Sequence, residues 1–370
     1  MFIQPINKVV FANIELGTGC PTSAGPAKPP PKTSEELIRP LLESFEKTLG
    51  VKTVYLDLAN REELDTSIMR HVEASDIVFS PDNAVSYAII KCLRRKGWPV
   101  NMNLVFDQHM DIYSYRTHGK LLAKPNPYRL ALDHNLLEFV LFLGARKLEM
   151  AFLEPFILLP EVLHFRRSPL DLLYAILRHS QGQHAGLKDL FSVIPAEGIP
   201  DFKTAVEDGL SILNSYYLAD THGFNQLAIR KKMRPGREAT FQSFGFEIDL
   251  DAFDSKVIQG VDYGPHLPQR LRREAQERFQ MTKLRNKNRA LYNLIRDLWY
   301  ISYYRHKIEC PGIAVPDQTM IREAMEAIHK SPLPCHFFHI TEFKPEFDSN
   351  GKTRELVKNL VTAAVEASRS

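Results

Sequence analysis

The stretch Leu104-Val105-Phe106-Asp107-Gln108-His109-Met110-Asp111 joins an apolar run to three polar side chains at alternate positions. Successive side chains of a strand point to opposite faces, so Asp107, His109 and Asp111 would share one face at the end of a strand at 103–106. In α/β proteins, the carboxyl ends of central strands border the crevice where ligands bind. Two carboxylates and an imidazole there predict a site for one or two divalent ions; a solvated loop with chance charges is the alternative.

A second apolar segment also ends in acidic residues. It reads Phe244-Gly245-Phe246-Glu247-Ile248-Asp249-Leu250-Asp251-Ala252-Phe253-Asp254, with Asp249 and Asp251 on one face. Burying several like charges without a partner is costly, and shared cations remove that cost. The two acidic strand ends therefore predict a cation between them, whereas Asp254 is expected to fix the loop by hydrogen bonds.

These paired motifs resemble those of the ureohydrolases, the arginase, agmatinase and formiminoglutamase family, which bind two manganese ions in an α/β fold. Three further segments follow in the family's order. They are Ser80-Pro81-Asp82-Asn83-Ala84-Val85-Ser86-Tyr87, where the family has Gly-Gly-Asp-His-Ser before a helix; His118-Gly119, where it has His-Gly; and Glu342-Phe343-Lys344-Pro345, where it has Glu-Val-Asn-Pro. Motifs in a matching order are more specific than any one of them.

The resemblance covers three blocks, roughly residues 76–145, 244–262 and 336–366, and it implies a division of the metal ligands. Asp107 and Asp249 would bridge two Mn²⁺ ions. Asp111 would complete one ion, and His109 and Asp251 would complete the other. An oxygen-rich ligand set with few imidazoles also suits Mn²⁺ better than Zn²⁺.

Asn83 departs from the family pattern, which has a histidine at this position. An amide oxygen is a weaker donor and cannot supply a nitrogen ligand. Two Mn²⁺ ions are expected, and the ion that Asp111 completes should bind more loosely through Asn83. Three outcomes follow: a weak second site, a one-metal enzyme, or a chain that keeps the fold without catalysis. Ser80-Pro81 in place of two glycines also alters this loop, because proline fixes φ and removes a donor.

Two residues are candidates for direct roles in catalysis. Glu342 could hold a guanidinium group, since a carboxylate accepts two parallel N–H bonds from such a planar cation; a surface glutamate at a strand end is the alternative. His118 could pass a proton to the leaving amine, as imidazole titrates near neutrality. An exposed loop histidine is the alternative there.

The resemblance implies a metal-dependent hydrolase acting on a non-peptide C–N bond. Its substrate would be a small linear guanidino or amidine compound, and its products urea or formamide and an amine. The main rival is a catalytically impaired protein of the same fold that serves as a binding or assembly subunit. The family commonly forms symmetric rings, so a homo-oligomer is expected.

The composition of the 370 residues is that of an ordinary globular protein, with 44% hydrophobic and 25% charged residues. A net charge of +3 gives no argument for a nucleic-acid or membrane partner. The N-terminus lacks the pattern of a secretory signal, and no apolar run approaches the length of a membrane span. Four scattered cysteines without a C-x-x-C pair suggest free thiols, so a cytoplasmic protein is expected.

Predicted strands alternate with predicted helices, which indicates right-handed crossovers and a mainly parallel sheet. We therefore expect one arginase-like domain over 1–370, with three α/β/α layers and helical insertions. Phe79, Phe106 and Leu143 would occupy neighbouring sheet positions. The strands are expected at 8–16, 51–56, 76–79, 103–106, 139–144 and 335–340, and the helices from 33–36 onward and at 66–72, 85–95 and 353–366.

Two segments are expected to be helical insertions, partly so at 155–236 and again at 265–310. Within the second, Gln269–Lys307 interleaves Arg and Lys with aromatic residues, a composition that can bind nucleic acid. A solvated helix face with inward aromatics is the more common structure, and Glu274, Glu277 and Asp297 dilute the charge. Nucleic acid is therefore not an expected partner.

Overall fold

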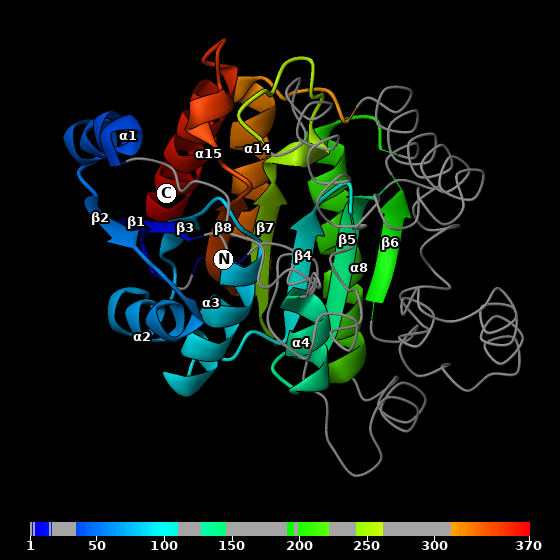
Figure 1. Ribbon diagram of the computed structural model, residues 1–370. Coiled ribbons are helices and arrows are strands. Elements are labelled where there is room, and N and C mark those ends of the chain that lie inside the picture. The colour runs from blue at the N-terminus through cyan, green and yellow to red at the C-terminus, as the bar shows by residue number, and fades with distance from the viewer. Residues whose placement is uncertain are drawn as a thin grey trace, which may run out of the picture.

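The computed structural model describes residues 2, 4–14, 16, 35–109, 127–145, 191–195, 199–221, 242–261 and 312–370. Within these residues, eight strands form one sheet in the order β2-β1-β3-β8-β7-β4-β5-β6, and every neighbouring pair is parallel (Figure 1). The strands are β1 (Lys8–Asn13), β2 (Lys52–Asp57), β3 (Ile77–Phe79), β4 (Met102–Phe106), β5 (Phe139–Ala145), β6 (Phe191–Pro195), β7 (Phe244–Asp249) and β8 (Cys335–Thr341).

Helices cover both faces of the sheet (Figure 1). One face carries α2 (Arg61–His71), α3 (Ala84–Arg95) and α4 (Pro127–Asp133). The other carries α1 (Glu35–Leu49), α8 (Phe202–Thr221), α14 (Gln318–Lys330) and α15 (Lys352–Arg369). The expected three-layer α/β/α architecture with a parallel central sheet is confirmed.

The strands are apolar on both faces because each face meets a helical layer. In β1, Val9 and Phe11 belong to the core under α1, α8, α14 and α15. Val10 and Ala12, which alternate with them, belong to the core under α2, α3 and α4. This alternation follows from the two-residue period of a strand, and it explains why the strand segments read as nearly continuous apolar runs.

The order of the strands differs from one sequence expectation. Phe106 of β4 does lie opposite Leu143 of β5. Phe79 of β3 instead pairs with Ile340 of β8, and both β8 and β7 separate β3 from β4. The expectation that Phe79 neighbours Phe106 was therefore wrong, because two strands from later in the chain, β7 and β8, lie between β3 and β4.

Part of the segment expected as an insertion at 155–236 belongs to the sheet and its helical layer. β6 extends the sheet beside β5, and Phe202 of α8 lies 5.1 Å from Phe106 of β4 between ring centroids. The rest of 155–236 and the whole predicted insertion at 265–310 lie outside the described residues. Among the helices that the structure describes, none has the length and apolar character that crossing a membrane requires.

Candidate metal centre

Four adjacent strands bring the acidic segments to one edge of the sheet. Because β3, β8, β7 and β4 are parallel neighbours, their carboxyl ends lie at the same edge. Phe106 lies opposite Ile248, so Asp107 and Asp249 leave neighbouring strands side by side. Glu342 follows β8 at this edge. The predicted convergence of the two acid-tipped strands is confirmed.

Among the described residues, the first group able to hold a metal ion consists of Asp107, His109 and Asp251, whose ligand atoms lie within 4.8 Å of one another. His109 Nδ1 is 3.2 Å from Asp251 Oδ2 and 3.5 Å from Asp107 Oδ1. The two carboxylates are buried, whereas the imidazole is partly exposed. We call these three residues the imidazole group.

The second group consists of Asp249, Asp251 and Glu342, again with ligand atoms within 4.8 Å of one another. We call it the carboxylate group. The two groups share Asp251, and neither contains both Asp107 and Asp249, the pair to which the family resemblance assigns the bridging role. The assignment of bridging ligands stays a prediction.

Local turns aim the carboxylates toward the edge. Asp107 Oδ1 accepts the backbone N–H of His109 at 2.7 Å, and Asp249 Oδ1 accepts the backbone N–H of Asp251 at 2.9 Å. Both are short-range side-chain turns of the kind that aspartate favours. The repeated Asp-x-His and Asp-x-Asp spacing therefore produces the same local geometry twice, and the Gln108 side chain adds a hydrogen bond to the Asp251 carbonyl.

Glu342 has a left-handed backbone conformation, with φ of 60°. This region costs a non-glycine residue about 1–2 kcal/mol, so surrounding contacts must hold it. The N–H of Phe343 donates to the Ser80 carbonyl at 3.1 Å, and that of Lys344 to the Gly260 carbonyl at 2.8 Å. Backbone strain of this kind is concentrated at functional sites.

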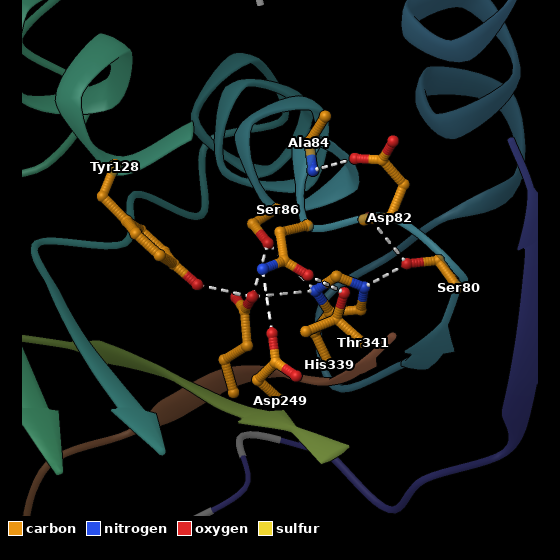
Figure 2. Close-up of polar contacts among 10 residues, drawn as sticks. Ser80, Asp82, Ala84, Ser86, Tyr128, Asp249, His339 and Thr341 are labelled. Atoms are coloured by element: carbon orange, nitrogen blue, oxygen red, sulfur yellow. Dashed lines mark hydrogen bonds and ion pairs between the residues drawn. The ribbon is translucent and has the colours of Figure 1, made fainter. Parts of the chain in front are cut away.

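Asn83 stands at the first position before α3, but its side chain makes no capping hydrogen bond to that helix. Asp82 performs that task, since its Oδ1 accepts the Ala84 N–H at 2.8 Å. The Asn83 amide nitrogen donates to Asp249 Oδ2 at 2.9 Å, and its oxygen accepts the Thr341 hydroxyl (Figure 2). In this arrangement the predicted ligand Asn83 is a hydrogen-bond donor to Asp249.

A buried polar network lies beneath this edge (Figure 2). Glu247 Oε1 accepts the Ser86 hydroxyl at 2.6 Å and the Tyr128 hydroxyl at 2.5 Å, and it is 3.4 Å from His339 Nδ1. The other ring nitrogen of His339 is 2.9 Å from Ser80 Oγ. The network connects β7 and β8 to α3 and α4. Sequence reasoning missed it, although a glutamate inside the apolar segment of β7 was a usable signal.

The donor set fits a divalent cation. Four carboxylate residues at this edge are at most 2% exposed, namely Asp107, Asp249, Asp251 and Glu342. Like charges buried so close together are unfavourable unless a cation or hydrogen-bond donors compensate them. Carboxylate oxygens with one imidazole nitrogen suit a hard ion such as Mn²⁺.

Several predicted residues fall elsewhere. The predicted ligand Asp111 and the predicted proton donor His118 lie outside the described residues. Asp254 belongs to neither group, and its Oδ1 accepts the Lys256 N–H at 2.9 Å. That bond agrees with the loop-fixing role expected for Asp254.

The described cysteines have no features of a nucleophile. Cys92 and Cys335 are buried free thiols. Burial raises the pKa of both, that of Cys335 to about 12. Since the thiolate is the reactive form, these two residues are part of the packing, as the scattered cysteine pattern suggested.

No family model matches this sequence, and neither does any curated protein. Solved structures do match. Formimidoylglutamase from Bacillus subtilis is 13% identical, with a TM-score of 0.50 over 99% of this chain and 88% of that one. Agmatine ureohydrolase of Thermoplasma volcanium is 15% identical, with a TM-score of 0.50 over 99% and 90%. Entamoeba histolytica arginase is 11% identical, with a TM-score of 0.50 over 98% and 99%. The chain therefore has the ureohydrolase fold.

Proposed function

We propose that this protein is a metal-dependent hydrolase that cleaves a non-peptide C–N bond in a small linear guanidino or amidine compound. The observation that carries the proposal is the meeting of Asp107, His109 and Asp251 at the carboxyl edge of the sheet. In open α/β folds, ligands bind beyond this edge. Mn²⁺ is the metal that the oxygen-rich donor set favours.

Each residue has a role that its chemistry supports. Asp107, His109 and Asp251 would bind the ion, which supplies the Lewis-acid chemistry that makes water a nucleophile near neutral pH. Glu342 would accept two N–H bonds from the planar cationic group of the substrate. We propose His118 as the residue that protonates the leaving amine.

The substrate class rests on the fold and on the charge of the site. The matching structures are named a formimidoylglutamase, an agmatine ureohydrolase and an arginase. A buried acidic edge favours a substrate with a cationic head over an anionic one. A homo-oligomer is proposed as the functional assembly, since the resembling family forms rings.

The test is a screen of the purified full chain with added Mn²⁺ for release of urea or amine. Arginine, agmatine, guanidinobutyrate and formiminoglutamate are the compounds to screen, and His109→Ala is the matched control, because it removes one ligand from the imidazole group. Hydrolysis of at least one compound by the parent chain, lost in the control, is the expected result. Failure on all four despite stoichiometric metal would contradict the proposed activity on this substrate class.

A second candidate function has one specific observation in its favour. The Asn83 amide donates to Asp249, a group that a two-metal hydrolase needs for its ions. A chain altered in this way could keep the fold as a binding or assembly subunit without catalysis. Fewer than one equivalent of Mn²⁺ after reconstitution would favour this candidate over the hydrolase.

A further inference from the structure

We propose that this chain binds one divalent ion, at the imidazole group, and that the Asn83 side chain closes the position of a second ion beside Asp249. The inference rests on the metal site of the proposed function. It concerns which of the two overlapping groups holds an ion, since Asp251 belongs to both.

Asp249 receives a hydrogen-bond donor on each carboxylate oxygen. The backbone N–H of Asp251 donates to Oδ1, and the amide nitrogen of Asn83 donates to Oδ2, both at 2.9 Å. Asp249 is itself buried, at 1% exposure. Donors in these positions stabilise a buried carboxylate without a cation. The Asn83 amide thus places the positive end of its dipole against the carboxylate.

The oxygen of the Asn83 amide also has a hydrogen-bond partner. The Thr341 hydroxyl donates to Asn83 Oδ1 (Figure 2). Thr341 lies directly opposite Asp249 in the pairing of β8 with β7. Turning the amide over to offer its oxygen to a metal would set that oxygen against Asp249 Oδ2 and lose the hydrogen bond to this carboxylate. Asn83 is therefore a poor ligand in its observed place.

Asn60 and Asn83 both precede a helix, but only Asn60 caps its helix through the side chain. Asn60 caps α2 in the usual way, accepting the N–H groups of Glu62 and Glu63 at 3.0 Å each. Asn83 makes no such bond, because Asp82 caps α3 in its place. The side chain of Asn83 instead donates a hydrogen bond to Asp249.

The two groups differ in their ligand atoms, because only the imidazole group offers a nitrogen. The imidazole group includes a ring nitrogen, His109 Nδ1, 3.2 Å from Asp251 Oδ2. The carboxylate group has only oxygens, of which those of Asp249 already accept donors. With the ion at the imidazole group, Asp251 is compensated, and under the proposed function Glu342 would accept N–H bonds from the cationic group of the substrate.

The experiment counts bound metal instead of activity. The full chain and its variants are dialysed to equilibrium against Mn²⁺, and bound manganese is measured by inductively coupled plasma mass spectrometry. We expect one equivalent in the parent chain. Asn83→His and Asn83→Asp, which each replace the amide donor with a ligand, should bind two equivalents. Asn60→Ala, the matched loss of an asparagine before a helix, should still bind one.

Two further variants locate the ion. His109→Ala should lose the single equivalent, whereas Glu342→Gln should retain it. Electron paramagnetic resonance gives an independent readout, because two adjacent Mn²⁺ ions couple and a single ion does not. A coupled signal is expected only in the two Asn83 variants. Circular dichroism establishes that each variant is folded before its metal is counted.

The possible failures are distinguishable. Two equivalents in the parent chain would overturn the single-ion inference and leave the proposed function standing. No bound manganese in the parent chain would remove the metal site itself, and with it the proposed function. Retention of the ion in His109→Ala with its loss in Glu342→Gln would place it at the carboxylate group. One equivalent in both folded Asn83 variants would show that Asn83 does not close the second position.

Discussion

Asp251 is the residue on which both candidate ligand groups depend. It follows β7 in the short helical turn η3 (Leu250–Ala252), and it is 2% exposed. Its backbone N–H stabilises Asp249 while its carboxylate lies beside His109. One residue thus organises Asp249 through its main chain and offers a metal ligand through its side chain.

Asp251→Asn should weaken Mn²⁺ binding by more than about 100-fold. Removing a residue that only supports a metal ligand costs up to about 100-fold in affinity, and Asp251 is itself a proposed ligand. The substitution keeps the size of the side chain and its backbone N–H, and it removes the charge. Isothermal titration with Mn²⁺ measures the change. Asp254→Asn is the matched control, since Asp254 lies in the same loop and belongs to neither group; equal losses in the two variants would contradict the assignment.

Glu342 offers a test of strain at a single residue. Because its φ of 60° suits glycine and costs other residues about 1–2 kcal/mol, Glu342→Gly should be more stable than Glu342→Ala by about 1 kcal/mol. Urea unfolding of the two variants measures the difference. Equal stability would mean that the left-handed conformation is not held in solution.

At the scale of elements, β7 shows how one strand serves both packing and the site. On one of its faces Gly245, Glu247 and Asp249 follow at alternate positions. Glu247 anchors the buried network and Asp249 reaches the edge. Gly245 makes room for a neighbouring ring: a Cβ there would lie 2.1 Å from Phe337 Cε1 and 2.7 Å from Asn103 Oδ1.

Gly245→Ala should therefore destabilise the protein by about 3 kcal/mol, which is at the upper end of the cost usually found when a core is overpacked. A smaller side chain at Phe337 relieves the clash, so combining Gly245→Ala with Phe337→Leu should cost less than the sum of the two single changes, by about 1 kcal/mol or more. Urea unfolding of the four proteins in the cycle measures the coupling. Simple additivity would show that β7 and β8 are not packed as described.

At the scale of the whole molecule, ionisable groups are buried at both ends of β8. Glu342 lies beyond its carboxyl end, whereas His336 lies near its start and is 6% exposed. Burial lowers the pKa of His336 below its ordinary value of 6.5, against hydrogen bonds with the backbone of Trp98 and Pro99 that raise it. Such a group links the stability of the fold to pH.

The sign of this linkage follows from the lowered pKa. Below pH 6.5 the unfolded chain binds a proton at His336 that the folded chain does not, so the free energy of unfolding falls as pH decreases. His336→Gln should reduce the slope in the pH range just below 6.5, by at most about 1.4 kcal/mol per pH unit. Urea unfolding across this range measures it, and an unchanged slope would contradict the buried neutral state of His336.

Much of this architecture could be predicted from local sequence alone. Apolar runs and helical spacing placed most described strands and helices within a few residues. A strand buried on both faces reads as a continuous apolar run, and a helix buried on one face repeats its apolar residues every three or four positions. The acidic ends at Asp107 and Asp249 indicated a shared edge, since parallel strands end together. Helices α4 and α14 and the strand β6 were missed, as short or weakly patterned segments leave little signal.

Only the tertiary structure decided which segments meet. The entry of β7 and β8 between β3 and β4, the pairing of Glu247 with His339, and the contact of Asn83 with Asp249 all join residues far apart in the chain. Local propensity carries no information about such partners, because their choice depends on how all the layers pack at once. The sequence thus determined the kinds of elements and the acidic character of the edge, and packing determined which ligand atoms face one another.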